Sequence, residues 1–345
     1  MTHNPRNASR QILLCCAAML VLTLLSACGP SKNRVRITGK FHHLDKAEFY
    51  VYNPEGKFEG LDTIRIDGGS FSFDKEIEEA EVLALLYPNF LRSYIIAEPG
   101  KTIRIEADAS HLDEADISGT EENKRLTEFR LKNIKLPESN ALLAAQQYIR
   151  DNAGSLDALA VFMQYFAYAK SPHANESLQL LQLMREKQPK NHSLEALDRH
   201  LRPVLENSTG RELPDFTAET TDGRTIGKKD FAGTKPLLIT FLASWTSESR
   251  EALRETNRLA RAHGDRLGQI VLSMDLNKKS FTDFTKSDTL RVTAICDGNG
   301  FSSPLAQRLG VHYVPGNLLV DKDGRIVARD LKKTELENTI ARLLK

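Results

Sequence analysis

Four cysteines supply the thiol chemistry available to this chain of 345 residues. A cysteine thiolate is a nucleophile, a metal ligand and the precursor of a disulfide, so the positions of the cysteines limit which of these reactions the protein can perform. Cys15, Cys16 and Cys28 lie in the first 28 residues, and Cys296 stands alone near the C-terminus. The first question is therefore what the N-terminal segment is.

That segment has the composition of a secretory signal peptide. Arg6 and Arg10 precede an apolar run at 12–25, and small residues follow it before Cys28. Because the run is shorter than the ~20 residues of a membrane-spanning helix, we expect a signal peptide over residues 1–27 rather than a transmembrane helix. The sequence Leu25-Ser-Ala-Cys28 resembles the lipobox of bacterial lipoproteins, in which the cysteine is acylated and becomes the new N-terminus.

The lipobox resemblance implies a lipid anchor at Cys28 and a tether over residues 28–34. Gly29 follows the cysteine, which indicates the outer membrane, and residues 30–34 lack the acidic cluster associated with surface export. We therefore expect the periplasmic face. Cleavage removes 27 of the 345 residues and two of the 47 Lys and Arg residues, leaving 318 residues, a net charge of −1 and Cys296 as the one free thiol.

The overall composition excludes several classes of protein. Hydrophobic residues make up 41% and charged residues 27% of the chain, which is typical of globular domains and excludes wholesale disorder or a fibrous repeat. Lys and Arg number 47 against 46 Asp and Glu, which provides no electrostatic basis for binding nucleic acid.

Residues 35–119 predict an all-β domain. Short alternating segments are separated by turn sequences such as 53–56, 67–70 and 98–101, without helical segments between them, which favours a β-sandwich. His42 and His43 fall within it, but neighbours on a strand point to opposite faces, so this pair is a poor metal site. We expect strands around 35–37, 49–52, 64–66, 71–73, 82–86, 94–97 and 103–105.

Residues 120–207 change to helical periodicity. Apolar residues from Leu156 to Ala167 recur at helical spacing after Ser155, a candidate N-cap, and the pattern continues to Leu201, which predicts three to five short helices. The aromatic residues at 162–168 could form a ligand surface, but a helix–helix core is the favoured interpretation.

The last block, residues 210–345, alternates strands and helices. The continuous apolar run at 237–243 predicts a buried central strand, and residues 247–263 predict the helix that follows it. The whole chain is thus expected to be multi-domain, with an N-terminal all-β sandwich, a central α-helical segment and a C-terminal α/β domain. Further strands and helices are expected at 269–274, 278–286, 292–296, 318–321, 326–329 and 334–344.

Several motifs of this block occur in the order found in one family. Together they resemble the TlpA/ResA-type thioredoxin-like domain of the AhpC/TSA-like superfamily, from about Gly210 to Lys345, and the β block resembles the domain of unknown function that precedes such domains in Gram-negative lipoproteins. The motifs are Leu213-Pro-Asp-Phe216, Thr221-Asp-Gly-Arg224, Phe231-Ala-Gly233, Phe241-Leu-Ala-Ser-Trp245, Arg250, Val314-Pro315 and Leu319-Val-Asp-Lys-Asp-Gly-Arg-Ile326.

The resemblance implies a Trp-Cys-x-x-Cys-Arg motif at the turn between strand and helix. A helix N-terminus lowers the pKa of the first thiol, and the second thiol, one turn later, resolves the mixed disulfide. Here the stretch 245–250 reads Trp-Thr-Ser-Glu-Ser-Arg, so both sulfur positions are hydroxyls, Thr246 and Ser249. Because hydroxyls do not cycle between dithiol and disulfide, we expect no oxidoreductase activity, no cofactor and no catalytic residues.

The other features of the family site are retained. Pro315 matches the family's cis-proline, and the residue before it, Val314, matches the position that pairs with extended substrate backbone. Glu248 is an acidic residue in the first helical turn, which suits the helix N-terminus but opposes a thiolate or phosphate there. Gly316 stands where the family usually has threonine.

The first of three hypotheses is a non-redox binding or scaffolding protein. Trp245, Thr246, Glu248, Ser249, Val314 and Pro315 would form a groove for an extended peptide or a periplasmic protein. The same residues would also be kept if the fold alone required them, and the sequence does not separate these explanations.

Two alternatives retain an enzyme. Cys296 could act alone as a peroxidatic or mixed-disulfide thiol, but the adjacent Asp297 raises its expected pKa and a buried structural cysteine is favoured. Ser249 or Thr246 could act as the nucleophile of a hydrolase with His312 as base and Asp215 or Glu248 as acid. No Gly-x-Ser-x-Gly elbow is present to support it.

Overall fold

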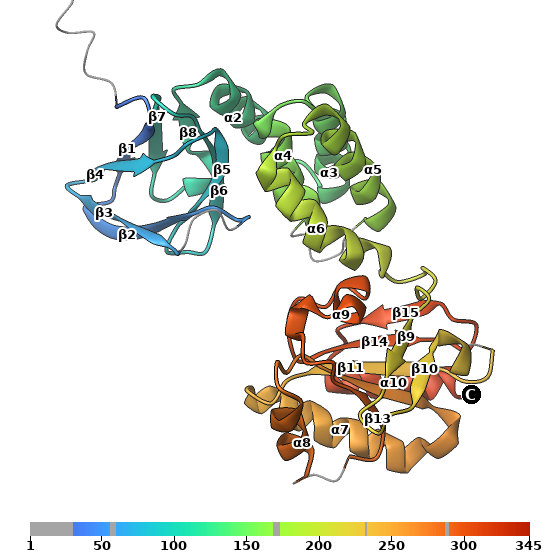
Figure 1. Cartoon of the computed structure of the whole chain (residues 1–345). Coiled ribbons are helices and arrows are strands. Elements are labelled where there is room, and N and C mark those ends of the chain that lie inside the picture. The colour runs from blue at the N-terminus through green and yellow to red at the C-terminus, as the bar shows by residue number, and fades with distance from the viewer. Residues whose placement is uncertain (1–29, 56–59, 168–172, 232, 287–289) are drawn as a thin grey trace, which may run out of the picture. The chain divides into compact units, whose positions relative to one another are not determined.

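The computed structural model describes residues 30–55, 60–167, 173–231, 233–286 and 290–345 (Figure 1). The expected signal peptide and the lipidation site Cys28 lie outside these residues. The chain divides into two compact units, Met1–Ala169 with Gln182–Leu194 and Lys170–Leu181 with Glu195–Lys345. Within the described residues, no helix combines the length and apolar character needed to cross a bilayer.

The first unit begins with an eight-stranded sheet in the order β6-β5-β2-β3-β4-β1-β7-β8, which confirms the expected β-rich N-terminal domain. Neighbouring strands are antiparallel except β1 and β7, which run parallel. The strands are β1 (Arg34–His42), β2 (Lys46–Tyr52), β3 (Asp62–Asp67), β4 (Ser70–Glu76), β5 (Glu81–Leu86), β6 (Arg92–Ala97), β7 (Thr102–Asp108) and β8 (Asp116–Ser118).

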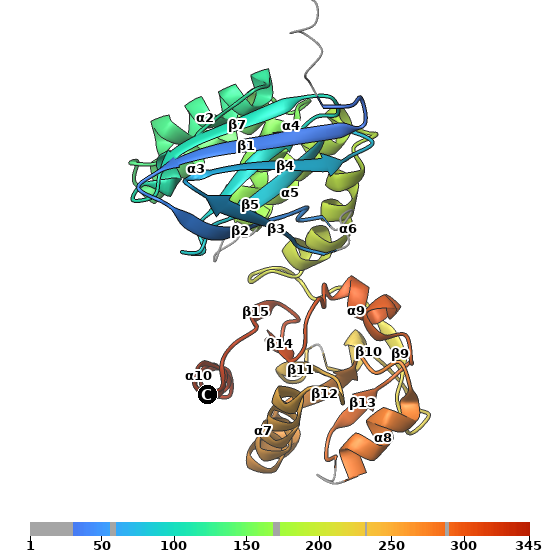
Figure 2. The same ribbon diagram turned by 90° about the vertical axis from the view of Figure 1, so that its left-hand side faces the viewer.

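Alternate residues of these strands build one core. The sheet curls, so that residues from both of its halves join a single buried cluster (Figure 2). Phe49 lies at its centre, where its ring meets Phe41 edge-on at 5.0 Å and Tyr87 at 5.1 Å between ring centroids. Aromatic edge-to-face packing of this kind adds to the burial of apolar area in stabilising the domain.

Helix α2 (Glu121–Asn133) packs against both edges of the curled sheet. Asn123 accepts a hydrogen bond from the amide of Ile96 on β6 (2.9 Å) and donates one to its carbonyl (2.7 Å). One turn later, Thr127 makes the same pair of bonds to Ile117 on β8 (3.2 and 2.8 Å). Polar side chains on one face of a helix thus satisfy the backbone of two edge strands that would otherwise be unpaired.

In the described part of residues 120–207 the structure has five α-helices, within the predicted number. Phe162 and Phe166 are fully buried, which agrees with the prediction that the aromatic residues at 162–168 form a helix–helix core. Tyr168 lies outside the described residues. The helices are α2, α3 (Glu138–Asp151), α4 (Leu156–Phe162) followed by a π-helical turn (Met163–Ala167), α5 (Ala174–Lys187) and α6 (His192–Glu206).

A buried carboxylate joins the first three of these helices. Asp157 has no exposed surface, and its Oδ2 accepts from Arg125 Nε of α2 (2.8 Å) and from the Tyr148 hydroxyl of α3 (2.9 Å). Its Oδ1 accepts from the amide of Ala158 (2.9 Å) and from the hydroxyl of Ser155. Ser155 occupies the N-cap position of α4, as expected, but it caps the helix through this carboxylate rather than through a helical amide.

The second unit contains a five-stranded mixed sheet in the order β13-β12-β11-β14-β15, preceded by a two-stranded hairpin, which confirms the thioredoxin-like α/β architecture. Its strands are β9 (Thr217–Glu219), β10 (Thr225–Gly227), β11 (Leu237–Leu242), β12 (Gly268–Ser273), β13 (Thr293–Ile295), β14 (Gly316–Val320) and β15 (Ile326–Arg329). Its helices are α7 (Ser247–His263), α8 (Lys278–Lys286), α9 (Pro304–Arg308) and α10 (Lys333–Leu343).

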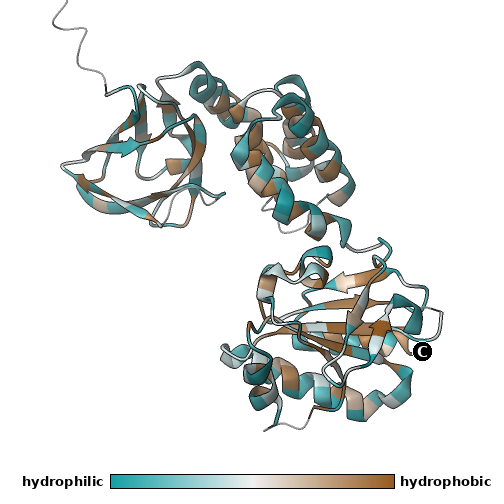
Figure 3. Ribbon diagram, in the orientation of Figure 1, coloured by the Kyte–Doolittle hydropathy of each residue, from teal (hydrophilic) through white to brown (hydrophobic). Residues whose placement is uncertain are grey.

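Both faces of this sheet are covered, and its strands are mostly apolar and buried (Figure 3). Leu237, Ile239 and Phe241 of β11 pack in one cluster with residues of α9 and the β9–β10 hairpin. Leu238 and Leu242 face the other side, against α7, α8 and α10. This buried central strand carries the chain to the turn at which α7 begins.

Candidate functional site

The candidate site lies where β11 ends and α7 begins. Thr246 is the N-cap of α7, and its Oγ1 accepts a hydrogen bond from the amide of Ser249 (3.1 Å). The Thr246 hydroxyl donates to Ser249 Oγ (2.7 Å), which also accepts from the amide of Ala243 (3.1 Å). Ser249 is fully buried. The two hydroxyls are therefore paired with each other and with the backbone, and neither acts as a free nucleophile.

Residues next to this pair remain accessible. Trp245, the one tryptophan of the chain, is 56% exposed. The carboxylate of Glu248 accepts hydrogen bonds from its own backbone amide and from the Ser247 hydroxyl, and these bonds hold its pKa below the ordinary value. Glu248 is therefore anionic at neutral pH, as expected for the first turn of a helix.

The loop before β14 completes the site. The Val314–Pro315 peptide bond is cis. No hydrogen bond among the described residues uses the backbone amide or carbonyl of Val314. Pro315 and Glu248 line the same groove, of about 270 Å³, between α7, β14 and α10. Of the six residues that the sequence assigned to the peptide groove, Glu248 and Pro315 line it, and the other four do not.

Gly316, the departure from the family pattern, has a local cause. A Cβ at this position would lie 2.8 Å from a carboxylate oxygen of Asp330 and 3.2 Å from the ring of Phe241. That Asp330 oxygen also accepts from the amide of Asn317 (3.3 Å). A side chain at residue 316 would displace this carboxylate, which accounts for the glycine.

Asp275 is a site residue that sequence reasoning missed. It lies two residues after the end of β12 and is 1% exposed. Its carboxylate accepts from the amide of Ser244 (3.2 Å to each oxygen), from the Ser244 hydroxyl, and from the Ser273 hydroxyl (2.7 Å). It therefore ties the turn carrying Trp245 to the end of β12. The sequence does contain one indication of this role, an acidic residue just after the C-terminal end of a predicted buried strand.

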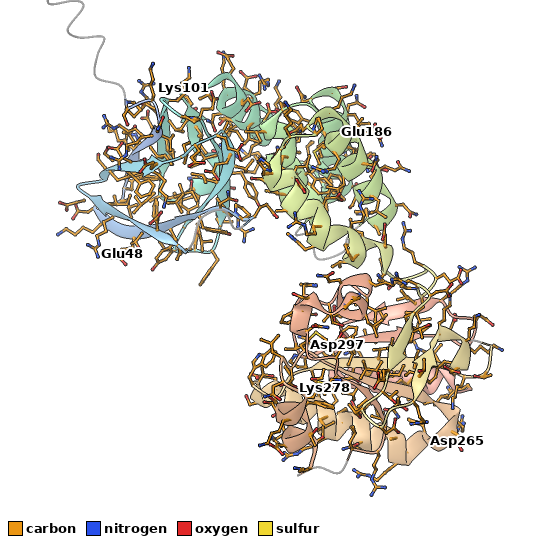
Figure 4. All side chains as sticks on the ribbon, in the orientation of Figure 1. Glu48, Lys101, Glu186, Asp265, Lys278 and Asp297 are labelled. Carbon is orange, nitrogen blue, oxygen red and sulfur yellow. The ribbon has the colours of Figure 1, made fainter. Side chains whose placement is uncertain are left out.

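We expect Asp275→Asn to loosen this turn. The replacement keeps the shape of the side chain but presents an NH₂ group to donors, so the free energy of unfolding should fall by about 1–3 kcal/mol. The emission maximum of Trp245 should shift to longer wavelength as the turn opens. Asp297→Asn, an exposed carboxylate in the loop after β13 (labelled in Figure 4), is the matched control. Unchanged unfolding and emission in Asp275→Asn would contradict the positioning role.

Cys296 is buried behind this carboxylate. It is 4% exposed, and its thiol lies 3.9 Å from the carbonyl oxygen of Asp275. Burial is the main cause that raises its pKa above the ordinary value, and the charges of Asp275 and Asp297 add to it. A raised pKa and a buried sulfur both oppose reaction as a thiolate. The structure favours the structural role for this thiol over the peroxidatic one.

The hydrolase constellation is not assembled. Nδ1 of His312 lies 3.1 Å from the carbonyl oxygen of Gly310, and its ring packs edge-on against Tyr313. Among the described residues, no hydrogen bond joins His312 to Thr246 or Ser249.

No group of metal-binding side chains forms in the described parts of the chain. In the N-terminal domain, His42 and His43 each pair with a different carboxylate, Glu106 (3.0 Å) and Asp108 (2.9 Å).

Comparison with known proteins gives two family matches. Residues 35–126 match a domain of unknown function, DUF4369, and residues 209–329 match the AhpC/TSA family. Thiol-disulfide oxidoreductase ResA of Bacillus thuringiensis subsp. konkukian and that of Bacillus cereus are each 25% identical over 137 residues, which cover 39% of this chain and 76% of the relative.

Two solved structures resemble the second unit. The C-terminal domain of a putative thiol-disulfide oxidoreductase from Bacteroides thetaiotaomicron is 28% identical with a TM-score of 0.38, covering 40% of this chain and 97% of that one. A thiol-disulfide oxidoreductase from Bacteroides fragilis is 27% identical with a TM-score of 0.36, covering 39% and 99%.

Proposed function

We propose that this chain, which belongs to the thioredoxin-like thiol-disulfide oxidoreductase family through its C-terminal domain, is a lipid-anchored periplasmic protein that binds extended polypeptide without redox chemistry. A DUF4369 domain precedes the C-terminal domain. The observation that carries the proposal is the hydroxyl pair of Thr246 and Ser249. The hydrogen bond between these two hydroxyls stabilises the turn at which the family has its two cysteines, and Trp245 is exposed next to it.

The unpaired backbone of Val314 supports a binding role. An extended polypeptide can add to such an amide and carbonyl as a strand adds to a sheet edge. The groove beside Pro315 gives the side chains of that polypeptide a place to lie. None of these contacts needs a thiol, so binding can persist where oxidoreductase chemistry has been lost.

Replacing Val314 tests the proposal. We expect residues 29–345 to capture reduced, alkylated ribonuclease A, a permanently unfolded polypeptide, and to lose at least about tenfold in affinity on Val314→Pro, which removes the backbone amide. Val314→Ala, which keeps the backbone unchanged, should bind like wild type, and circular dichroism should show that both variants are folded. Equal capture by the Pro and Ala variants would contradict the groove.

The anchor rests on the lipobox alone. Two or more acyl chains at Cys28 would hold the protein stably at a membrane. In cells grown with labelled palmitate, the wild-type chain should therefore carry the label and the Cys28→Ser chain should not. Equal label in the two chains would contradict lipidation at Cys28.

A further inference from the structure

The groove beside Pro315 carries an unbalanced charge. Three carboxylates of α7, Glu248, Glu251 and Glu255, line it on one face of the helix, and Lys333 of α10 lines it from the other side. Residues at positions i, i+3 and i+7 of a helix share a face, which is why one helix supplies all three. Leu336 of α10 adds apolar surface to the lining.

Among the residues that the structure describes, cations compensate one of the three carboxylates. Glu255 pairs with Arg258 (2.6 Å) and with Lys333 (3.6 Å), and these pairs hold its pKa below the ordinary value. Glu251 forms no ion pair with any described residue, and Glu248 is contacted by a hydroxyl and a backbone amide. The groove therefore presents two negative charges next to Pro315.

Two arginines of α7 contact other residues. The guanidinium of Arg250 lies over the ring of Phe284 on α8, 4.6 Å from its centroid. Arg258 is occupied by Glu255 and Glu337. Neither arginine lines the groove, so neither cancels its charge.

Exposed apolar side chains lie near the same turn. Trp245 is 56%, Leu276 75% and Phe301 40% exposed. The bonds from Ser244 to Asp275 join the two loops that carry Trp245 and Leu276, and a Cβ at Gly300 would lie 2.8 Å from Leu276. Apolar residues this exposed mark a surface for binding when they gather in one place.

We propose that the site selects extended polypeptide segments in which lysine or arginine neighbours an apolar residue, with the cation facing Glu248 and Glu251. Charge complementarity decides this class, because the unpaired charges of the groove are negative while the adjacent patch is apolar. The inference rests on the proposed peptide-binding function and names the class of peptide for the same groove.

Three matched peptides test the preference. They are of equal length, free of tryptophan, capped at both ends, and differ only in carrying Lys, Gln or Glu on both sides of a central Leu. Binding to residues 29–345 is followed by the emission of Trp245 and by calorimetry. We expect the Lys peptide to bind about tenfold tighter than the Gln peptide at low salt, since each exposed charge pair contributes up to about fivefold. The Glu peptide should bind most weakly, and 0.5 M NaCl should reduce the differences.

Matched variants assign the preference to the two carboxylates. Glu248→Gln with Glu251→Gln should abolish the preference, so that the double variant binds the Lys peptide and the Gln peptide within about twofold of each other. Glu219→Gln, which removes an exposed carboxylate of β9, should keep the wild-type order. Equal binding of all three peptides to the wild type would overturn the charge preference and leave peptide binding intact. No binding of any peptide would overturn the proposed function itself.

Discussion

Thr246→Cys combined with Ser249→Cys should give this domain thiol-disulfide oxidoreductase activity. With dithiothreitol as reductant, we expect the double variant to reduce insulin disulfides at least about 100-fold faster than the wild-type chain. The wild type has no dithiol to cycle, and Cys296, its one described cysteine, is buried. The measurement is the rate of insulin precipitation at pH 7.

The geometry for this gain is already in place. The Oγ atoms of Thr246 and Ser249 are 2.7 Å apart, so sulfur atoms on the same Cβ atoms come within reach of a disulfide. The first thiol would occupy the N-cap of a 17-residue helix, where the exposed amides stabilise a thiolate. Trp245 and Val314 need no change, because they would contact the substrate as the proposed groove already does.

The single variants are the controls. Thr246→Cys alone and Ser249→Cys alone should remain at the wild-type rate, because a lone thiol cannot resolve a mixed disulfide. Adding Glu248→Gln to the double variant should raise the rate further. The anionic carboxylate at this turn opposes the thiolate, so removing its charge lowers the pKa of the introduced thiol. Inactivity of a folded double variant with an intact dithiol would contradict our account of the site.

The fold was predictable because its signals are local. The apolar run at 237–243 and the helical spacing that follows it predict β11 and α7 from neighbouring residues alone. The alternation of residues 35–119 likewise predicts its strands. The register and order of those strands, including the parallel pairing of β1 with β7, depend on distant segments and do not appear in any local pattern.

The site was predictable only in part for the same reason. Thr246, Ser249 and Pro315 were found because their motifs can be read along the chain. Asp275 was missed because its partner, Ser244, lies 31 residues away. Asn123 forms two hydrogen bonds with the backbone of Ile96 on an edge strand, but no local pattern in the sequence distinguishes it from other polar residues of a helix.

The largest loss of stability is expected in the first unit, on Asp157→Ala. The variant leaves the partly exposed Arg125 and the Tyr148 hydroxyl without their shared acceptor, and losing hydrogen bonds to a buried charged group costs about 3 kcal/mol. Burial, followed by the charge of Asp157, already raises the pKa of Tyr148, which shows how closely the two groups interact.

Two probes can locate this loss. Circular dichroism at 222 nm follows the helices of both units during urea unfolding, whereas the emission of Trp245 follows only the second unit. We expect Asp157→Ala to move the dichroism transition to lower urea while the Trp245 transition stays in place.

Asp151→Ala is the matched control for Asp157→Ala. Asp151 lies at the exposed end of α3, where its carboxylate accepts a single hydrogen bond from Gln147 (2.8 Å). Removing an exposed acceptor of this kind changes stability by about 0.5 kcal/mol or less, because water replaces the lost bond. If both variants unfold at the urea concentration of the wild type, Asp157 does not hold α2, α3 and α4 together. If the urea transition shifts in Asp157→Ala alone, the buried carboxylate of Asp157 stabilises the helical segment. This role depends on the contact of three helices, so it cannot be read from the sequence.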